Sequence, residues 1–130
     1  MANLKTPSDL KYTKNDEWVR IENGVGTIGI TDYAQDQLND IVYVELPDVG
    51  AEFKKSESFG VVESVKAASD LYLPVGGKVS SINSKVQDEP ELINSDPYGE
   101  GWLVKIQVAN ANDTADLMDA DAYAKYCETR

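Results

Sequence analysis

Histidine is absent from this 130-residue sequence, and the single cysteine is Cys127. The lack of histidine removes the most common general base, the most common neutral metal ligand and every Ser–His or Cys–His dyad. One cysteine excludes an internal disulfide and offers no thiolate cluster for zinc or iron. A catalytic site would have to rest on carboxylates, lysine or tyrosine, and the sequence has no glycine-rich phosphate loop. We therefore expect that the protein is not an enzyme and binds no metal.

Basic residues are few: the chain has 12 Lys and Arg against 23 Asp and Glu, and its net charge is -11. They are not clustered, which argues against binding to nucleic acid or to an acidic membrane surface. No apolar run is long enough to span a membrane, and the first residues lack both an apolar signal region and an Arg-rich amphipathic pattern. We expect a cytoplasmic protein whose acidic surface keeps it soluble or steers it toward basic faces of protein partners.

Short apolar runs, separated by Gly, Pro, Asn and Asp, make up much of a chain that is 42% hydrophobic and 27% charged. This pattern is typical of short β-strands joined by turns, and the length suits a single domain over residues 1–130. Helical spacing over about 113–128 predicts a C-terminal helical segment that packs on the β core. The expected fold is therefore mainly β, a sandwich or flattened barrel with short helices at its margins.

Local motifs predict where the first turn and the first helix begin. The pair Asn23-Gly24 readily supplies the positive φ angles of a type I′ turn and predicts a β-hairpin. Gly26 and Gly29, in the second strand of that hairpin, suggest either a bend or a close approach of another group to the backbone. Thr31 is a good cap for a short helix over residues 32–38.

Lys66 lies in a small polar stretch between two apolar runs, which predicts a β-hairpin over about 59–75 with this lysine near its tip. A lysine in such a turn is most often a solvated tip that keeps the hairpin soluble. Here, however, the neighbours Val65, Ala67 and Ala68 carry no charge, so a modifying enzyme would meet the amine alone. Lysine offers an amine on a long stem for an amide bond, and acylation removes its charge. Lys66 is therefore a candidate attachment site for a chemical group that the protein orients.

The block GVVESVKAASDLYLPVGGKV is similar to the lipoyl-attachment signature of the glycine cleavage H-protein family. The blocks GITDYAQ, DIVYVELPDVG and ELINSDPYGEGWLVKI resemble other stretches of that family, in the same order. The resemblance implies a barrel-sandwich hybrid of the biotinyl/lipoyl-carrier type. It also implies that Lys66 carries a covalently attached lipoyl group.

By the same resemblance, the lipoyl-lysine arm would shuttle the aminomethyl group of glycine between enzymes. Glycine decarboxylase, the P protein, would load the arm, and an aminomethyltransferase, the T protein, would unload it. Dihydrolipoyl dehydrogenase, the L protein, would reoxidise the arm, and lipoylation enzymes would attach lipoate in the first place. We expect transient encounters with these partners and a monomeric carrier.

The resemblance places Glu17 near the arm, where its carboxylate could bind the ammonium of the carried group through a charge-assisted hydrogen bond. Asp70 is a second candidate, and either residue could instead be a surface carboxylate that contributes little as an ion pair. The sequence departs from the family's usual pattern at Asp16 and Tyr33, where histidine is frequent. These departures put in doubt any role of histidine in partner docking or amine shelter, and we expect Asp16 to make the pocket more acidic.

Several alternatives differ in what Lys66 would carry. A biotin carrier usually has methionine on both sides of the lysine, whereas this sequence has Val65 and Ala67. A lipoyl domain of a 2-oxo acid dehydrogenase would continue into a flexible linker, and none is recognisable here. A relay that passes lipoyl or octanoyl groups to other enzymes stays open, because sequence does not separate it from the glycine cleavage role. An unmodified scaffold would follow if the lysine were never acylated.

Overall fold

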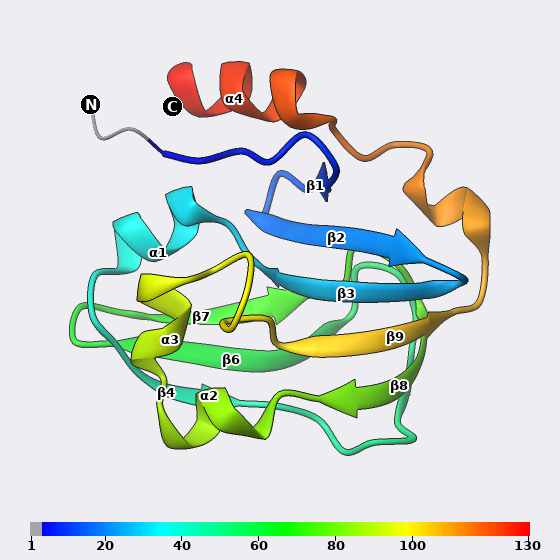
Figure 1. Cartoon of the computed structure of the whole chain (residues 1–130), viewed down its shortest axis with the longest axis horizontal. Coiled ribbons are helices and arrows are strands. Elements are labelled where there is room, and N and C mark those ends of the chain that lie inside the picture. Colours follow the sequence, from blue (N-terminus) through cyan, green and yellow to red (C-terminus); the bar gives the residue numbers. More distant parts are fainter. Residues whose placement is uncertain (1–3) are drawn as a thin grey trace.

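The computed structural model describes residues 4–130 and contains two antiparallel β-sheets with short helices at their margins (Figure 1). The larger sheet has six strands in the order β1-β2-β3-β9-β8-β5, and the smaller has three in the order β4-β6-β7. The strands of the larger sheet are β1 (Lys11–Tyr12), β2 (Glu17–Glu22), β3 (Val25–Ile30), β5 (Glu52–Phe53), β8 (Gly77–Ile82) and β9 (Val104–Val108). Those of the smaller sheet are β4 (Ile41–Glu45), β6 (Ser58–Ser64) and β7 (Ala68–Tyr72). The predicted mainly β fold is confirmed, and the two sheets form a sandwich that does not close into a barrel.

The helices are α1 (Asp32–Leu38), α2 (Ser84–Asp88), α3 (Glu91–Ser95) and α4 (Ala120–Glu128), together with the 3-10 turn η1 (Ala111–Thr114). Helices α1 and α3 lie side by side at one end of the sheets, and α4 packs on β1 (Figure 1). Helix α2 is not predicted from the sequence, because it is a single short turn that buries only Val86. No helix within residues 4–130 is both long and apolar enough to cross a membrane.

The predicted C-terminal helix over 113–128 is only partly correct. Helix α4 begins at Ala120, where the side chain of Asp119 accepts a hydrogen bond from the backbone N–H of Ala122 at 2.8 Å. Before it, Met118 pairs with Tyr12 as a strand would, through N–H···O=C bonds of 2.8 and 2.9 Å in the two directions. A backbone that is hydrogen-bonded to β1 cannot also form the intrahelical bonds of α4, so the helix starts later than its spacing suggests.

The hairpin over 59–75 is present, but its second strand begins earlier than the apolar run 71–75 suggests. Strand β7 starts at Ala68, and its polar residues Ser69 and Asp70 pair with β6 while their side chains remain exposed. One face of this strand lies at the surface, so polar residues do not exclude it from the sheet.

The predicted turn and cap at the first hairpin are confirmed. Asn23 and Gly24 both have positive φ, 52° and 79°, and the Thr31 hydroxyl accepts a hydrogen bond from Ala34 N–H at 3.2 Å. Gly29 is needed because the ring of Trp18 covers it: a Cβ at position 29 would lie 2.7 Å from that ring.

The buried side chains form two clusters. The larger contains residues from both sheets, including Ile28, Val62, Leu71, Val79 and Ile106. The smaller lies between α4 and the β1–β2 edge and consists of Leu10, Tyr12, Trp18, Tyr123 and Cys127. In it the rings of Tyr12 and Tyr123 stack with centroids 4.6 Å apart, which fixes α4 against the larger sheet.

We predict that Thr31→Val destabilises the protein by about 1–3 kcal/mol, because it removes the cap of α1 and a second, buried hydrogen bond. The Thr31 hydroxyl also lies 2.7 Å from the Tyr123 hydroxyl. Thr31→Ser keeps the hydroxyl and should retain most of the stability. Urea unfolding of the two variants measures the difference, and a Thr31→Val protein as stable as the wild type would show that the two hydrogen bonds do not contribute to stability.

Candidate functional site

Lys66 lies in the turn between β6 and β7, and its side chain is exposed. The side chain of Ser64 organises the turn, because its Oγ accepts hydrogen bonds from the backbone N–H groups of Lys66 at 3.1 Å and Ala67 at 3.0 Å. The backbone N–H of Ser64 also donates to the Ala67 carbonyl at 2.8 Å. These bonds fix the backbone on both sides of the lysine, and the predicted location near the hairpin tip is confirmed.

A second element holds the turn from outside the hairpin. The N–H of Val65 donates to the carbonyl of Asp40 at 3.1 Å, and Lys66 Nζ donates to the carbonyl of Gln37, near the end of α1, at 3.2 Å. The last turn of α1 therefore contacts the amine of the lysine turn, and the connection between α1 and β4 contacts its backbone.

Asn94 on α3 in turn fixes that connection. Its Oδ1 accepts a hydrogen bond from Ile41 N–H at 2.9 Å, and its Nδ2 donates to the carbonyl of Asn39 at 2.8 Å. Asn39 has a positive φ of 63°, a conformation that needs such support. Sequence reasoning missed Asn94, because its partners lie more than fifty residues away in the sequence.

A small cavity of about 170 Å³ is lined by residues of β2, β3, β6, β7 and α1 and of the loop before β2; we call it the arm pocket. Its apolar wall consists of Ile30, Ala34, Leu38, Val62 and Leu71. Its polar wall includes Asp16, Glu17, Gln37 and Asp70. Gln37 lines the pocket and also accepts the hydrogen bond from Lys66 Nζ, so the amine is bonded to a residue of the pocket wall.

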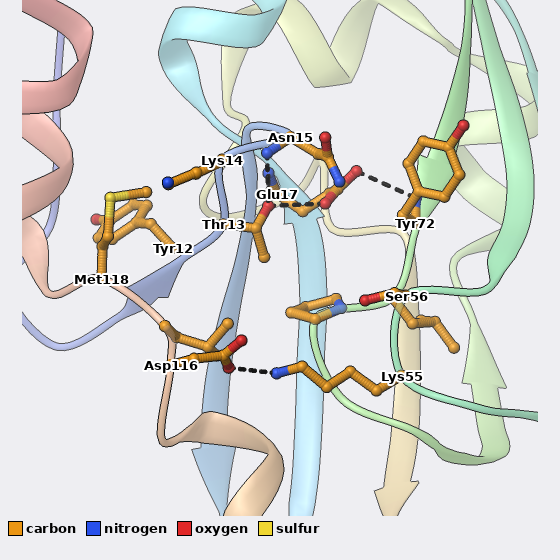
Figure 2. Close-up of a pocket in the computed structure, with 13 residues that line it drawn as sticks. Tyr12, Thr13, Lys14, Asn15, Glu17, Lys55, Ser56, Tyr72, Asp116 and Met118 are labelled. Atoms are coloured by element: carbon orange, nitrogen blue, oxygen red, sulfur yellow. Dashed lines mark hydrogen bonds and ion pairs between the residues drawn. The ribbon is translucent and has the colours of Figure 1, made fainter.

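Glu17, the first residue of β2, is almost completely buried, with 1% of its surface exposed. Its carboxyl accepts hydrogen bonds from the Thr13 hydroxyl at 2.8 Å and from Tyr72 N–H at 3.1 Å (Figure 2). Burial raises the pKa of Glu17 from its ordinary 4.5 to about 7, although these two hydrogen bonds oppose the shift. The carboxyl therefore changes its charge near neutral pH.

Glu17 also lines a second, larger cavity of about 390 Å³ on the other side of the Thr13–Glu17 loop. Figure 2 shows Tyr72 and Ser56 on one side of this cavity and Met118 and Tyr12 on the other, with Lys55 paired to Asp116 below.

Asp70 lines the arm pocket as well, so the structure brings together the two carboxylates that the sequence singled out. Unlike Glu17, Asp70 is exposed, and its only side-chain contact within the described residues is a long hydrogen bond of 3.5 Å from the Tyr72 hydroxyl. A charge on Asp70 is therefore well solvated, whereas a charge on Glu17 is not.

Asp16 lines the arm pocket, and its negative charge adds to the effect of burial in raising the pKa of Glu17. The Asp16 carboxylate forms two hydrogen bonds with Arg130, of 2.5 and 2.9 Å, which partly offset its charge, and it accepts a third from the Tyr123 hydroxyl at 2.8 Å. Tyr33, the other departure from the family pattern, lies under the same guanidinium, 4.3 Å from ring centroid to Cζ. Sequence reasoning missed this cluster, because 114 residues separate Asp16 from Arg130.

Comparisons with known proteins show the family of this chain. Residues 10–130 match the family described as glycine cleavage H-protein. The glycine cleavage system H protein of Symbiobacterium thermophilum is 57% identical over 95% of this chain and 94% of that protein. The mitochondrial H protein 2 of Arabidopsis thaliana is 52% identical over 92% of this chain and 77% of that protein.

A solved structure is similar as well. The crystal structure of a glycine cleavage system H protein from Mycobacterium marinum superimposes with a TM-score of 0.88, at 38% identity, over 94% of this chain and 98% of that one. This chain therefore belongs to the glycine cleavage H-protein family.

Proposed function

We propose that this chain is the lipoyl carrier of a glycine cleavage system, with Lys66 as the residue that bears the lipoyl group. The observation that supports this most strongly is an exposed lysine on a hydrogen-bonded turn, whose amine is bonded to Gln37 in the wall of a pocket. A turn held in this way lets a long arm move while its point of attachment stays fixed. The chain itself would be a non-catalytic subunit, a single carrier domain over residues 1–130.

The residues around the lysine suit a lipoyl group. The arm is a largely apolar chain that ends in a five-membered ring containing two sulfur atoms. It can pack against the apolar wall of the arm pocket, which includes Ile30, Leu38 and Leu71. Gln37 lies where the stem of the arm would begin, and its carbonyl can accept a hydrogen bond from an amide nitrogen as it does from Nζ. When bound, the lipoyl group supplies the sulfur atoms to which the aminomethyl group of glycine is transferred.

Glu17 and Asp70 would hold the ammonium of the carried group. Both face the arm pocket, and hydrogen bonds between a carboxylate and a cationic amine are among the stronger ones in proteins. Glu17 would contribute more to binding this ammonium than Asp70, because its burial excludes water that would otherwise compete for the ammonium. An ammonium in the pocket favours the charged form of Glu17 and so compensates for the desolvation that raises its pKa.

The partners we propose are glycine decarboxylase (P protein), aminomethyltransferase (T protein) and dihydrolipoyl dehydrogenase (L protein), together with lipoylation enzymes. The net charge of -11 would speed encounters with basic faces on these enzymes without making the complexes permanent. We propose further that the carrier acts as a monomer and, in keeping with the sequence, in the cytoplasm.

Lys66→Arg should abolish lipoylation, because arginine keeps the charge but has no amine that can form the amide. Intact-mass spectrometry after coexpression with a lipoylation enzyme measures the adduct. Lys78→Arg, at an exposed lysine of β8, is the matched control and should be lipoylated like the wild type. A lipoyl adduct that persists in Lys66→Arg would place the attachment site elsewhere. Carriers that are lipoylated but fail to support glycine decarboxylation by authentic P protein would favour the relay instead.

Glu17→Gln in the lipoylated, loaded carrier should hasten release of the amine into water by about tenfold, because one charge-assisted hydrogen bond is lost. Asp70→Asn should have a smaller effect, since that carboxylate is exposed. The control is Glu63→Gln, which removes an exposed carboxylate of β6 that does not line the pocket. Release is measured as free ammonia over time, and unchanged release in both pocket variants would contradict the proposed role of these carboxylates.

The stability of the unmodified protein should depend on the charge of Glu17. The native state keeps this proton up to about pH 7, whereas the unfolded chain loses it near its ordinary pKa of 4.5. The contribution of Glu17 to the free energy of unfolding is therefore largest below pH 4.5. It falls by about 3 kcal/mol in all as the pH rises to 7. Glu17→Gln lacks the ionisable group and should lack this component.

Urea unfolding at steps between pH 4.5 and 8 gives the free energy of unfolding of the wild type and of Glu17→Gln at each pH. The difference between the two free energies measures the contribution of the Glu17 charge. A difference that stays constant across this range would show that burial does not raise the pKa of Glu17.

A further inference from the structure

Arg130 forms the best-enclosed ion pair among the described residues. Its Nη1 and Nη2 donate to the two carboxylate oxygens of Asp16 at 2.5 and 2.9 Å, and the two side chains are only 24% and 15% exposed. The guanidinium also lies over the rings of Tyr33 and Tyr126, 4.3 and 4.6 Å from their centroids. A two-pronged pair with stacked rings on its faces holds its geometry much better than an ordinary surface ion pair does.

Asp16 links Arg130 to the first turn of α1 through the hydroxyls of Tyr123 and Thr31. The Tyr123 hydroxyl donates to Asp16 Oδ1 at 2.8 Å, and burial raises the pKa of Tyr123, which keeps the donor proton in place. Since that hydroxyl has only one hydrogen, the Thr31 hydroxyl must donate to Tyr123 across the 2.7 Å between them. The Thr31 oxygen is at the same time the cap of α1.

Asp16 also shapes the loop that ends at Glu17. Its backbone N–H donates to the Thr13 carbonyl at 3.2 Å, and its carbonyl accepts a hydrogen bond from Thr31 N–H at 2.9 Å. Asp16 itself has a positive φ of 67°, which a residue with a side chain adopts only when its surroundings hold it there. Arg130 therefore binds Asp16, and the backbone conformation of Asp16 sets the direction in which the chain enters β2 at Glu17.

We propose that Arg130 is a positioning residue for the arm pocket. By binding Asp16 it fixes the Thr13–Glu17 loop and the start of α1, and these two elements carry the Glu17 carboxyl and Gln37 to the pocket. Arg130 does not line the pocket, and it acts through Asp16 and through its contact with Tyr33 of α1. The inference rests on the proposed role of Glu17 toward the carried amine, and it assigns a function to a residue that lies outside every stretch of the sequence that suggested the site.

The first test uses the unmodified protein and backbone hydrogen exchange. Arg130→Gln should speed exchange of the Glu17 and Tyr72 amides roughly tenfold, because both hydrogen bonds depend on the position of the loop. The Glu17 N–H donates to Thr13 Oγ1, and the Tyr72 N–H donates to the Glu17 carboxyl. Arg130→Lys keeps the charge but not the two-pronged geometry, so its effect should be intermediate.

The control is Lys85→Gln, which removes one positive charge from an exposed pair with Glu100 at 3.5 Å and should change neither amide. Amides of β9 report global unfolding in the same samples. No acceleration at Glu17 and Tyr72, or an equal acceleration of these amides and those of β9, would overturn the inference.

The second test uses the lipoylated, loaded carrier. Arg130→Gln should hasten release of the amine, by less than Glu17→Gln does, and the double variant should be no faster than Glu17→Gln alone. Additive effects, or no effect of Arg130→Gln where Glu17→Gln has one, would overturn the inference and leave the role of Glu17 intact. If Glu17→Gln itself leaves release unchanged, the shelter by Glu17 fails, and the exchange rates then decide by themselves whether Arg130 positions the loop.

Discussion

The turn that carries Lys66 depends on hydrogen bonds from outside its own hairpin. Within its own sheet, Ser64 orders the backbone around the lysine, and β4 pairs with β6 as far as Ser64. The bond from Val65 N–H to the carbonyl of Asp40 joins the turn to the connection between α1 and β4, and Asn94 joins that connection to α3. The lysine turn is thus held by α1, by the connection that follows α1 and, through that connection, by α3. If an arm is attached at Lys66 as we propose, its motion would be confined mainly to its own single bonds.

Burial makes the two carboxylates of the arm pocket unequal. Asp70 remains in contact with water, whereas Glu17 has lost nearly all of it and keeps only two hydrogen-bond donors in exchange. Because its pKa is about 7, Glu17 is protonated in part of the molecules at neutral pH. It can lose its proton when a cation binds in the pocket, yet without that cation it carries less negative charge than an ordinary carboxylate would. Asp16 is paired with Arg130, and its charge still raises the pKa of Glu17.

The features predicted correctly from sequence depend on short segments. The turn at Asn23-Gly24, the cap at Thr31 and the hairpin around Lys66 each follow from residue types that lie within a few positions of one another. The errors occur where a distant strand competes with local preference. Met118 has helical spacing around it, yet its backbone pairs with Tyr12, and the helix begins only after Asp119.

By itself, the sequence determined the mainly β class, the family resemblance and the position of Lys66, because these depend on local pattern and on motifs that are continuous in the chain. Only the tertiary structure decided that Glu17 is buried, that Asp70 shares its pocket, and that Asn94 and Arg130 support the two sides of the site. The physical reason is that solvent exposure and hydrogen bonds between residues 50 to 114 positions apart are set by how sheets and helices pack, and no periodicity in the sequence records which residues will meet.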